Sequence, residues 1–477
     1  MNKVVKNYFY NASYQVLLVV LPIIVTPYVS RVLGASGVGT YNYTNSITQF
    51  FMVFGCIGLS LYGQREVAYY QNDIEKRSKV FFEILIFRLI SLSISLIIYY
   101  FCFVMNSKYA SIFIIQMIDI ISYIFDVSWF FQGMEEFKKI VLRNFVIRIF
   151  CVAAIFVFVK VPSDLPIYVF IYSSTLLIGN LSLWFYLPKY IKKIDIKVLQ
   201  LKKHLKPTLT IFLPQIASTV YSLLDKTMIE MITKSTEEVA YYSQSQMIIR
   251  TIAEVINSLG TTLMPRIAFL YKSGNKEEVK KYMNGSIRFV LAFATAFAFG
   301  IMAVSQNFVP WFFGEGFEKV VPNLMILSPI LIFMGMTCIL GTQYLVAIGR
   351  QKQYATAIIC AAIVNFCLNV ILINCFASCG AALASILAEC VSCLIMLYFL
   401  RKDFDFFKVC KVFIKYIIIG IIMMGVVIVV GNYFAASIVN TLILVLLGAM
   451  VYIGLLLISK DPIITNVLDG IKSKIKF

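Results

Sequence analysis

Long runs without any charged residue constrain this chain more than any other feature. Residues 7–30, 289–314 and 416–459 contain no Asp, Glu, Lys or Arg. A helix needs about 20 apolar residues to cross the roughly 30 Å hydrocarbon core of a bilayer, and the third run is long enough for two crossings, with a turn at Gly431-Asn432. Charged residues make up only 14% of the 477 positions, against about 25% in soluble domains. The sequence therefore predicts an integral membrane protein.

The apolar runs do not alternate in polarity as the strands of a membrane β-barrel do. We therefore predict an all-α fold with about fourteen transmembrane helices. The spans are expected near residues 10–33, 41–64, 80–104, 110–133, 142–160, 166–188, 208–232, 240–265, 286–310, 322–348, 355–375, 380–400, 412–434 and 438–459. An even number of spans places both termini on the same side.

Lysine and arginine indicate which side that is. The segments on the side of the termini contain 32 of these residues, and those on the other side contain 5. Because short cytoplasmic loops carry an excess of positive charge, we expect both termini in the cytoplasm and the chain in the plasma membrane. The net charge of +18 then reflects loops that face anionic lipid head groups, and it does not indicate nucleic-acid binding.

The two halves of the chain resemble each other. Residues 38–43 (VGTYNY) align with residues 239–244 (VAYYSQ) at a shift of 201, and the same shift places Arg65 on Arg266. Six spans separate the two copies, so both begin on the same side of the membrane and are parallel repeats.

This repeat predicts two pseudo-symmetric six-helix lobes. The N-terminal lobe (helices 1–6) is expected over residues 1–206, and the C-terminal lobe (helices 7–12) over residues 207–403. Two further helices, 13 and 14, and a cytoplasmic tail follow in residues 404–477. A cavity between two such lobes is the usual place for substrate in an alternating-access transporter.

Charged residues inside spans are candidate functional residues, because each costs several kcal/mol unless it faces a cavity or a partner. Arg250 lies midway along its expected span, and Glu254 follows one helical turn later. A cation at this depth suits a passing pyrophosphate or carboxylate. In the seventh span, Lys226 and Glu230 have the i,i+4 spacing of an ion pair, so they are either a structural pair or part of a site.

Other polar residues have simpler interpretations. Arg88 and Arg148 lie within two turns of cytoplasmic helix ends, so snorkelling to the interface is an alternative to a role in a cavity. Asp119 and Asp126 are seven residues apart and are expected on one face of the fourth span. The single histidine, His204, follows two lysines and is expected to be a solvated loop residue.

We expect no catalytic residues, no metal and no cofactor, with proton or cation coupling as an open option. Nearly all of the eleven cysteines lie in apolar runs, where free cysteine behaves as a small hydrophobic residue. Cys390 and Cys393 form a C-x-x-C pair, but there is no second pair and no nearby histidine to complete a zinc site.

Several segments resemble the Wzx-type polysaccharide repeat-unit flippases. Residues 213–228 (LPQIASTVYSLLDKTM) are similar to the seventh helix of that family, and residues 126–135 (DVSWFFQGME) to its fourth-helix signature. Residues 63–66 (GQRE) and 241–244 (YYSQ) also match. One departure is residues 346–348 (VAI), where many relatives have a proline.

The resemblance implies the two-lobed fold of the multidrug/oligosaccharidyl-lipid/polysaccharide (MOP) exporter superfamily. The implied substrate is an undecaprenyl-pyrophosphate-linked oligosaccharide that is flipped from the inner to the outer leaflet for capsule or exopolysaccharide assembly. The expected partners are this lipid-linked oligosaccharide and the bilayer, with a polysaccharide polymerase and other assembly proteins as further candidates. The motifs carry over Asp225, Lys226, Arg65, Arg266 and Trp129.

We predict roles for these residues in an alternating-access mechanism. The residues expected to contact substrate are Arg250, Arg31 and Lys226, and those expected to couple or gate transport are Asp225, Glu254, Asp126, Arg65 and Arg266. Three alternatives stay open: a drug or cation exporter of the same superfamily, a lipid II-type flippase, and a membrane polysaccharide polymerase. The polymerase would require a large extracytoplasmic loop, and the predicted loops are all short.

Overall fold

The computed structural model describes the backbone of residues 3–404 and 406–465. Within these residues the chain is built of helices and contains no strand, which confirms the all-α class. Two compact units are present, Met1–Glu230 with Ser235–Ala240 and Met231–Lys234 with Tyr241–Phe477. This division groups most of α8 (Leu205–Thr233) with the first unit. The six-helix lobes stay a prediction.

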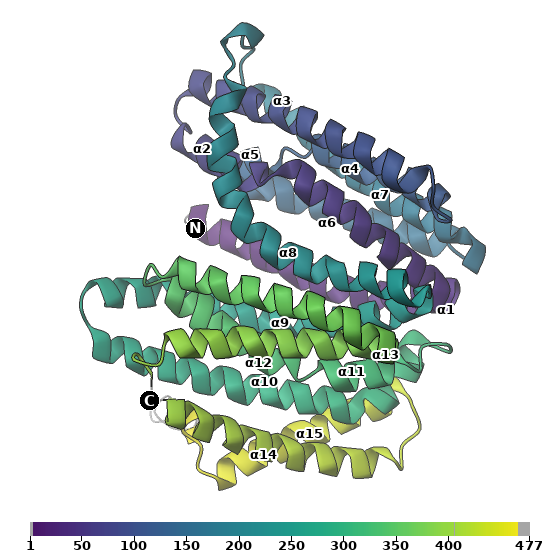
Figure 1. Cartoon of the computed structure of the whole chain (residues 1–477), viewed down its shortest axis with the longest axis vertical. Helices are drawn as coiled ribbons and strands as arrows, with labels where there is room; N and C mark the ends of the chain where they lie inside the picture. The colour runs from purple at the N-terminus through teal and green to yellow at the C-terminus, as the bar shows by residue number, and fades with distance from the viewer. Residues whose placement is uncertain (1–2, 405, 466–477) are drawn as a thin grey trace. The chain divides into compact units, whose positions relative to one another are not determined.

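The first unit contains α1 to α8, shown from purple to teal in Figure 1. The α-helices before α8 are α1 Lys3–Cys56, α2 Leu59–Tyr69, α3 Ile74–Tyr99, α4 Ala110–Ile124, α5 Ser128–Gly133, α6 Phe137–Phe158 and α7 Leu165–Ser182. Shorter helical segments are η1 Tyr100–Val104, η2 Pro162–Asp164, η3 Leu183–Lys189, η4 Ile196–Val198 and η5 Leu201–His204. Helix α7 packs against both α4 and α6.

The second unit contains most of α9 and the helices that follow it. They are α9 Thr236–Lys272, α10 Lys276–Phe313, α11 Val320–Leu327, α12 Ile330–Thr337, η6 Cys338–Val346, α13 Gln351–Phe399, α14 Phe406–Gly431 and α15 Ile438–Ile458. Helices α14 and α15 pack against each other and against α10, and Gly420 lets α14 approach the ring of Phe299 closely.

Nine helices of the described chain are long and apolar enough to cross a membrane, or ten if the bent pair Val320–Leu327 and Ile330–Val346 forms one span. Fourteen spans therefore stay a prediction. Two of the nine helices are interrupted where the sequence predicts a connection between two spans. Gly34 in α1 has φ 66°, and Ala377 in α13 has φ 50°.

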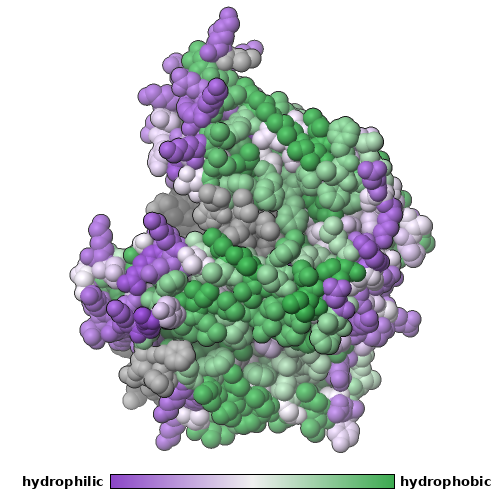
Figure 2. Space-filling model, viewed as in Figure 1, coloured by the Kyte–Doolittle hydropathy of each residue, from purple (hydrophilic) through white to green (hydrophobic). Residues whose placement is uncertain are grey.

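The distribution of hydropathy agrees with a membrane protein. In each unit, apolar residues cover the middle of the helices, and hydrophilic residues gather near the helix ends (Figure 2). This pattern matches the charge-free runs of the sequence, since the charged residues that separate those runs lie where helices begin and end.

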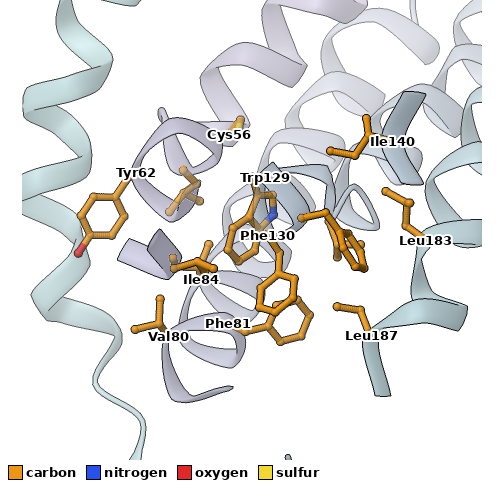
Figure 3. Close-up of a cluster of buried hydrophobic side chains, with 14 residues drawn as sticks. Cys56, Tyr62, Val80, Phe81, Ile84, Trp129, Phe130, Ile140, Leu183 and Leu187 are labelled. Atoms are coloured by element: carbon orange, nitrogen blue, oxygen red, sulfur yellow. The ribbon is translucent and has the colours of Figure 1, made fainter. Parts of the chain in front are cut away.

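An aromatic cluster holds the short helices α2 and α5 against α3 (Figure 3). The rings of Trp129 and Phe81 are stacked with their centroids 5.8 Å apart, and both side chains are buried. Gly63 makes this packing possible, because a Cβ atom there would lie 2.5 Å from the Trp129 ring. Trp129, which the family resemblance singled out, thus lies in the core of the first unit.

A close backbone approach shapes the turn inside α13. The added Cβ atom of an alanine at Gly380 would lie 2.0 Å from the carbonyl oxygen of Leu372, whereas nothing lies within 4 Å of the corresponding atom at Gly425 in α14. Only glycine therefore allows the two halves of α13 to meet at this turn.

We predict that Gly380→Ala lowers the stability of the purified protein by about 1–3 kcal/mol or more, because the new methyl group displaces backbone and not a flexible side chain. Gly425→Ala is the matched control and is expected to be neutral or to stabilise by about 0.5–1 kcal/mol, since alanine is the better helix former. Thermal unfolding in detergent measures both, and equal midpoints for the two variants would contradict this account of the turn.

Candidate functional site

Asp126 lies in a buried ion pair at the break between α4 and α5. Its Oδ2 atom is 3.5 Å from Nη2 of Arg88, and Nη1 of Arg88 donates to its carbonyl oxygen at 3.1 Å. Its Oδ1 atom also accepts from the backbone N–H of Ser128 at 2.9 Å. Asp126 therefore stabilises the bend, and its predicted coupling or gating role stays a prediction.

The snorkelling alternative for Arg88 and the shared helix face expected for Asp119 and Asp126 are both wrong. Arg88 does not snorkel, because its side chain is fully buried, with the ring of Tyr123 4.9 Å from its guanidinium carbon. Asp119 and Asp126 do not share one helix face, because α4 ends at Ile124. The break between α4 and α5 explains both results. It turns Asp126 away from the axis of α4, and the carbonyl oxygen and carboxylate of Asp126 become the acceptors that hold Arg88 in the interior.

The other candidates of the first unit lie on α1, α2 and α8. Arg31 is exposed on α1, three residues before the break at Gly34. Arg65 is exposed on α2, where its Nη2 atom is 3.0 Å from Oε1 of Glu66. Asp225 is buried and Lys226 half-buried on α8. The substrate-binding, coupling and gating roles of these four residues stay predictions.

Glu230, one turn beyond Lys226, takes part in a polar cluster at the end of α8. Its Oε1 atom lies 3.2 Å from Nζ of Lys108 and accepts from the hydroxyl of Tyr109 at 3.3 Å. Lys108 precedes α4 and lies 122 residues before Glu230 in the sequence. The i,i+4 spacing in the sequence therefore pointed to Lys226 as the partner of Glu230 and could not indicate Lys108. This cluster ties the end of α8 to the turn before α4.

The second unit carries Arg250, Glu254 and Arg266, all on α9. Arg250 lies 14 residues from the start of this 37-residue helix and is exposed, as is Glu254. Arg266 lies farther along α9, with Nη2 3.6 Å from Glu278. The three residues are thus spread along one helix.

His204 is not a solvated loop residue. Its ring is buried, with Nδ1 2.8 Å from the hydroxyl of Tyr62 and Nε2 2.9 Å from Oε2 of Glu83. Glu83 also pairs with Lys203 at 2.7 Å and accepts from the backbone N–H of Gln200 at 2.8 Å. The lysine-rich segment before α8 is therefore bound to α3 by a buried carboxylate that lies 121 residues earlier in the chain.

A family model described as "Polysaccharide biosynthesis protein" matches residues 4–271, which is more than half of the chain. The chain belongs to this family. A second model, MatE, matches residues 210–371.

Two curated relatives of this polysaccharide biosynthesis protein are similar along most of their length. A protein named "Putative O-antigen transporter" from Escherichia coli (strain K12) is 22% identical over 403 residues, which cover 83% of this chain and 97% of that protein. A protein of the same name from Shigella dysenteriae is 22% identical over 383 residues, covering 79% and 94%.

Solved structures show the same fold. The lipid II flippase MurJ in an inward closed conformation is 17% identical, with a TM-score of 0.77 and coverage of 96% of this chain and 100% of that one. A MATE family multidrug transporter in an inward-facing conformation has 13% identity, a TM-score of 0.64 and coverage of 85% and 95%. Together with the family match, these findings confirm a multi-pass membrane protein of the Wzx-type branch of the MOP superfamily, a group of transporters.

The buried histidine predicts a pH dependence of stability. Burial lowers the pKa of His204 below its usual value near 6.5, against the opposing hydrogen bond with Glu83. A neutral ring fits both contacts, with Nε2–H donating to Glu83 and Nδ1 accepting from Tyr62. The folded state therefore binds this proton less tightly than the unfolded state, and the contribution of His204 is present above about pH 6.5 and declines as the pH falls.

We predict that the unfolding midpoint of the wild-type protein exceeds that of His204→Gln most clearly at pH 7.5, and that the difference shrinks between about pH 6.5 and pH 5. Thermal unfolding of both proteins in the same detergent at several pH values measures this difference. A difference that is constant from pH 7.5 to pH 5 would show that the protonation of His204 is not linked to folding.

Proposed function

We propose that this member of the family is a flippase for undecaprenyl-pyrophosphate-linked oligosaccharide repeat units. It moves them by alternating access from the inner to the outer leaflet for capsule or exopolysaccharide assembly. The observation that carries the proposal is the family match over residues 4–271. Two relatives that are named O-antigen transporters and align along most of the chain support an oligosaccharide as the substrate class.

The position of Arg250 supports a substrate that contains a pyrophosphate group. A guanidinium group far from both ends of a helix is costly in a membrane unless it faces water or a ligand. Arg250 is exposed, about 21 Å along the helix axis from the start of α9. Because the planar fork of arginine matches phosphate oxygens, we assign Arg250 to hold the pyrophosphate during transport.

Further roles follow the same proposal. Lys226 is a second contact for the substrate, and Arg31 receives the head group near the outer face. Asp225 and Glu254 are the candidates for coupling transport to a proton or another cation, because both are carboxylates on helices that carry a proposed substrate contact.

The proposal predicts where the substrate accumulates in the native host. After deletion of the gene, complete lipid-linked units are expected in the inner leaflet, and the wild-type protein restores their export. Arg250→Ala, expressed at the wild-type level, is expected to slow export about 10- to 100-fold, because a hydrogen bond to a charged group is worth roughly 1.5–3 kcal/mol. The measurement is the fraction of units on each side of the membrane, with Arg401→Ala, another exposed arginine, as the control.

The possible results test the flippase function and the role of Arg250 separately. Full rescue by Arg250→Ala would keep the flippase and remove this residue from the mechanism. Units that reach the outer face and fail only to be joined into polymer would contradict the flippase and favour a polymerase.

We also infer a plasma-membrane location with both termini in the cytoplasm, from the positive charge of the loops on that side. A green fluorescent protein fused after residue 477 is expected to fluoresce, and alkaline phosphatase fused there to be inactive. Alkaline phosphatase inserted after Lys108 is expected to be active. Fluorescence and phosphatase activity are measured in living cells that express these fusions. The reverse pattern of activities would overturn the predicted orientation.

A further inference from the structure

A pocket of about 560 Å³ lies inside the second unit, between α9, α10 and η6. Pockets that bind small ligands typically have volumes of about 300–1,000 Å³. Most of the described lining residues belong to α10, and Leu263 of α9 and Ile339 of η6 complete the walls. The pocket is therefore large enough for a ligand, and one helix supplies most of the contacts that would select it.

The lining that α10 provides changes from charged to apolar along the helix. Glu278 and Lys281 line the pocket in the first two turns of α10. Phe289 and Val290 line it farther along, where the charge-free run of residues 289–314 begins. Glu278 and Val290 are twelve residues apart, which corresponds to about 18 Å along the helix. Since half of a bilayer's hydrocarbon core is roughly 15 Å thick, the pocket has the length and the polarity gradient of one lipid molecule.

The charged end of the pocket is positive. Nη2 of Arg266 on α9 lies 3.6 Å from Oε1 of Glu278, and the guanidinium carbon of Arg266 lies 5.8 Å from the centre of the Tyr282 ring. Both Glu278 and Tyr282 line the pocket. Arg266 thus compensates the carboxylate of Glu278, and Lys281 adds a further positive charge, so these three charged groups sum to +1. One phosphodiester group, with a single negative charge, complements them.

Gly285 leaves the middle of the pocket open. A Cβ atom at this position would meet no atom of the described residues within 4 Å. The neighbouring residue, Ser286, is held against the wall of the pocket, because its Oγ atom and Nε2 of Gln343 on η6 form a hydrogen bond of 2.8 Å. A larger side chain at Gly285 would therefore occupy the volume of the pocket without displacing its walls.

We propose that this pocket binds one glycerophospholipid of the bilayer, with its phosphate group beside Lys281 and an acyl chain along Phe289 and Val290. The apolar end favours an amphiphile over a wholly polar ligand, and the positive end favours a phosphate group. A pocket about one leaflet long suits an acyl chain, whereas an undecaprenyl chain is much longer. The ligand is a lipid of the membrane and not the transported substrate, so the inference goes beyond the proposed function and does not depend on it.

Two variants test the two ends of the pocket. Gly285→Leu fills the open volume, and Gly425→Leu on α14 is its matched control, because a Cβ atom at Gly425 also meets no described atom within 4 Å. Lys281→Gln removes the charge at the positive end. Its control is Lys280→Gln, since Lys280 is exposed and is not among the described residues that line the pocket. Leucine is a better helix former than glycine, so both leucine variants are expected to fold, and thermal unfolding in detergent verifies this.

The first measurement is native mass spectrometry of the purified, delipidated full chain in detergent, titrated with phosphatidylglycerol. The wild-type protein and the two control variants are expected to hold one phosphatidylglycerol more tightly than any further one. Gly285→Leu is expected to lose this tight site, and Lys281→Gln to bind there at least about tenfold more weakly, because it loses a charge-assisted hydrogen bond. Absence of a tight site in the wild-type protein, or an unchanged tight site in Gly285→Leu, would overturn the proposal.

The second measurement identifies the occupant by competition. Undecaprenyl pyrophosphate is added to the complex of the wild-type protein with phosphatidylglycerol at an equal concentration, and the tightly bound phosphatidylglycerol is expected to stay in place. Its displacement by the prenyl lipid, together with loss of prenyl binding in Gly285→Leu, would overturn the assignment and make the pocket a site for the substrate's chain. Neither measurement reads transport, so failure of the proposed flippase activity would be seen separately.

Discussion

In the hydrocarbon core of a bilayer no water can bond to a free backbone N–H or C=O group, so irregular backbone needs partners from the protein itself. The break between α4 and α5 meets this requirement. Arg88 donates to the freed carbonyl oxygen of Asp126, and the carboxylate of Asp126 accepts from the backbone N–H of Ser128. The carboxylate also balances the buried charge of Arg88. One ion pair thus allows the bend that positions the aromatic core around Trp129.

Several charged residues of the first unit bind one segment of the fold to another. Arg88 and Glu83 meet groups of opposite charge that lie far away in sequence, and each binds one segment of the fold to another. Arg143 and Arg148 of α6 also donate to an amide oxygen and a hydroxyl group of α7. A buried charge with an ionic partner is explained by the fold.

Helix positions were largely predictable from sequence, because charged residues mark the ends of apolar runs. The predicted connection after residue 375 contains the turn at Ala377, and α6 lies within five residues of its predicted bounds. The break inside the predicted span 110–133 was not foreseen, because Asp126 was taken as a charge on a continuous helix, whereas residues 125–127 separate α4 from α5. The position of His204 was also missed, because its partners Tyr62 and Glu83 come from distant helices.

The central claim is that this chain moves an intact lipid-linked oligosaccharide across a bilayer. The most direct test uses sealed proteoliposomes that contain the purified protein and a prenyl-pyrophosphate oligosaccharide with a fluorescent sugar, with a membrane-impermeant quencher added outside. The account predicts that substrate in the inner leaflet becomes accessible to the quencher when the protein is present, and that the oligosaccharide keeps its length. A protected fraction that matches protein-free liposomes, or an oligosaccharide that grows in length, would contradict it.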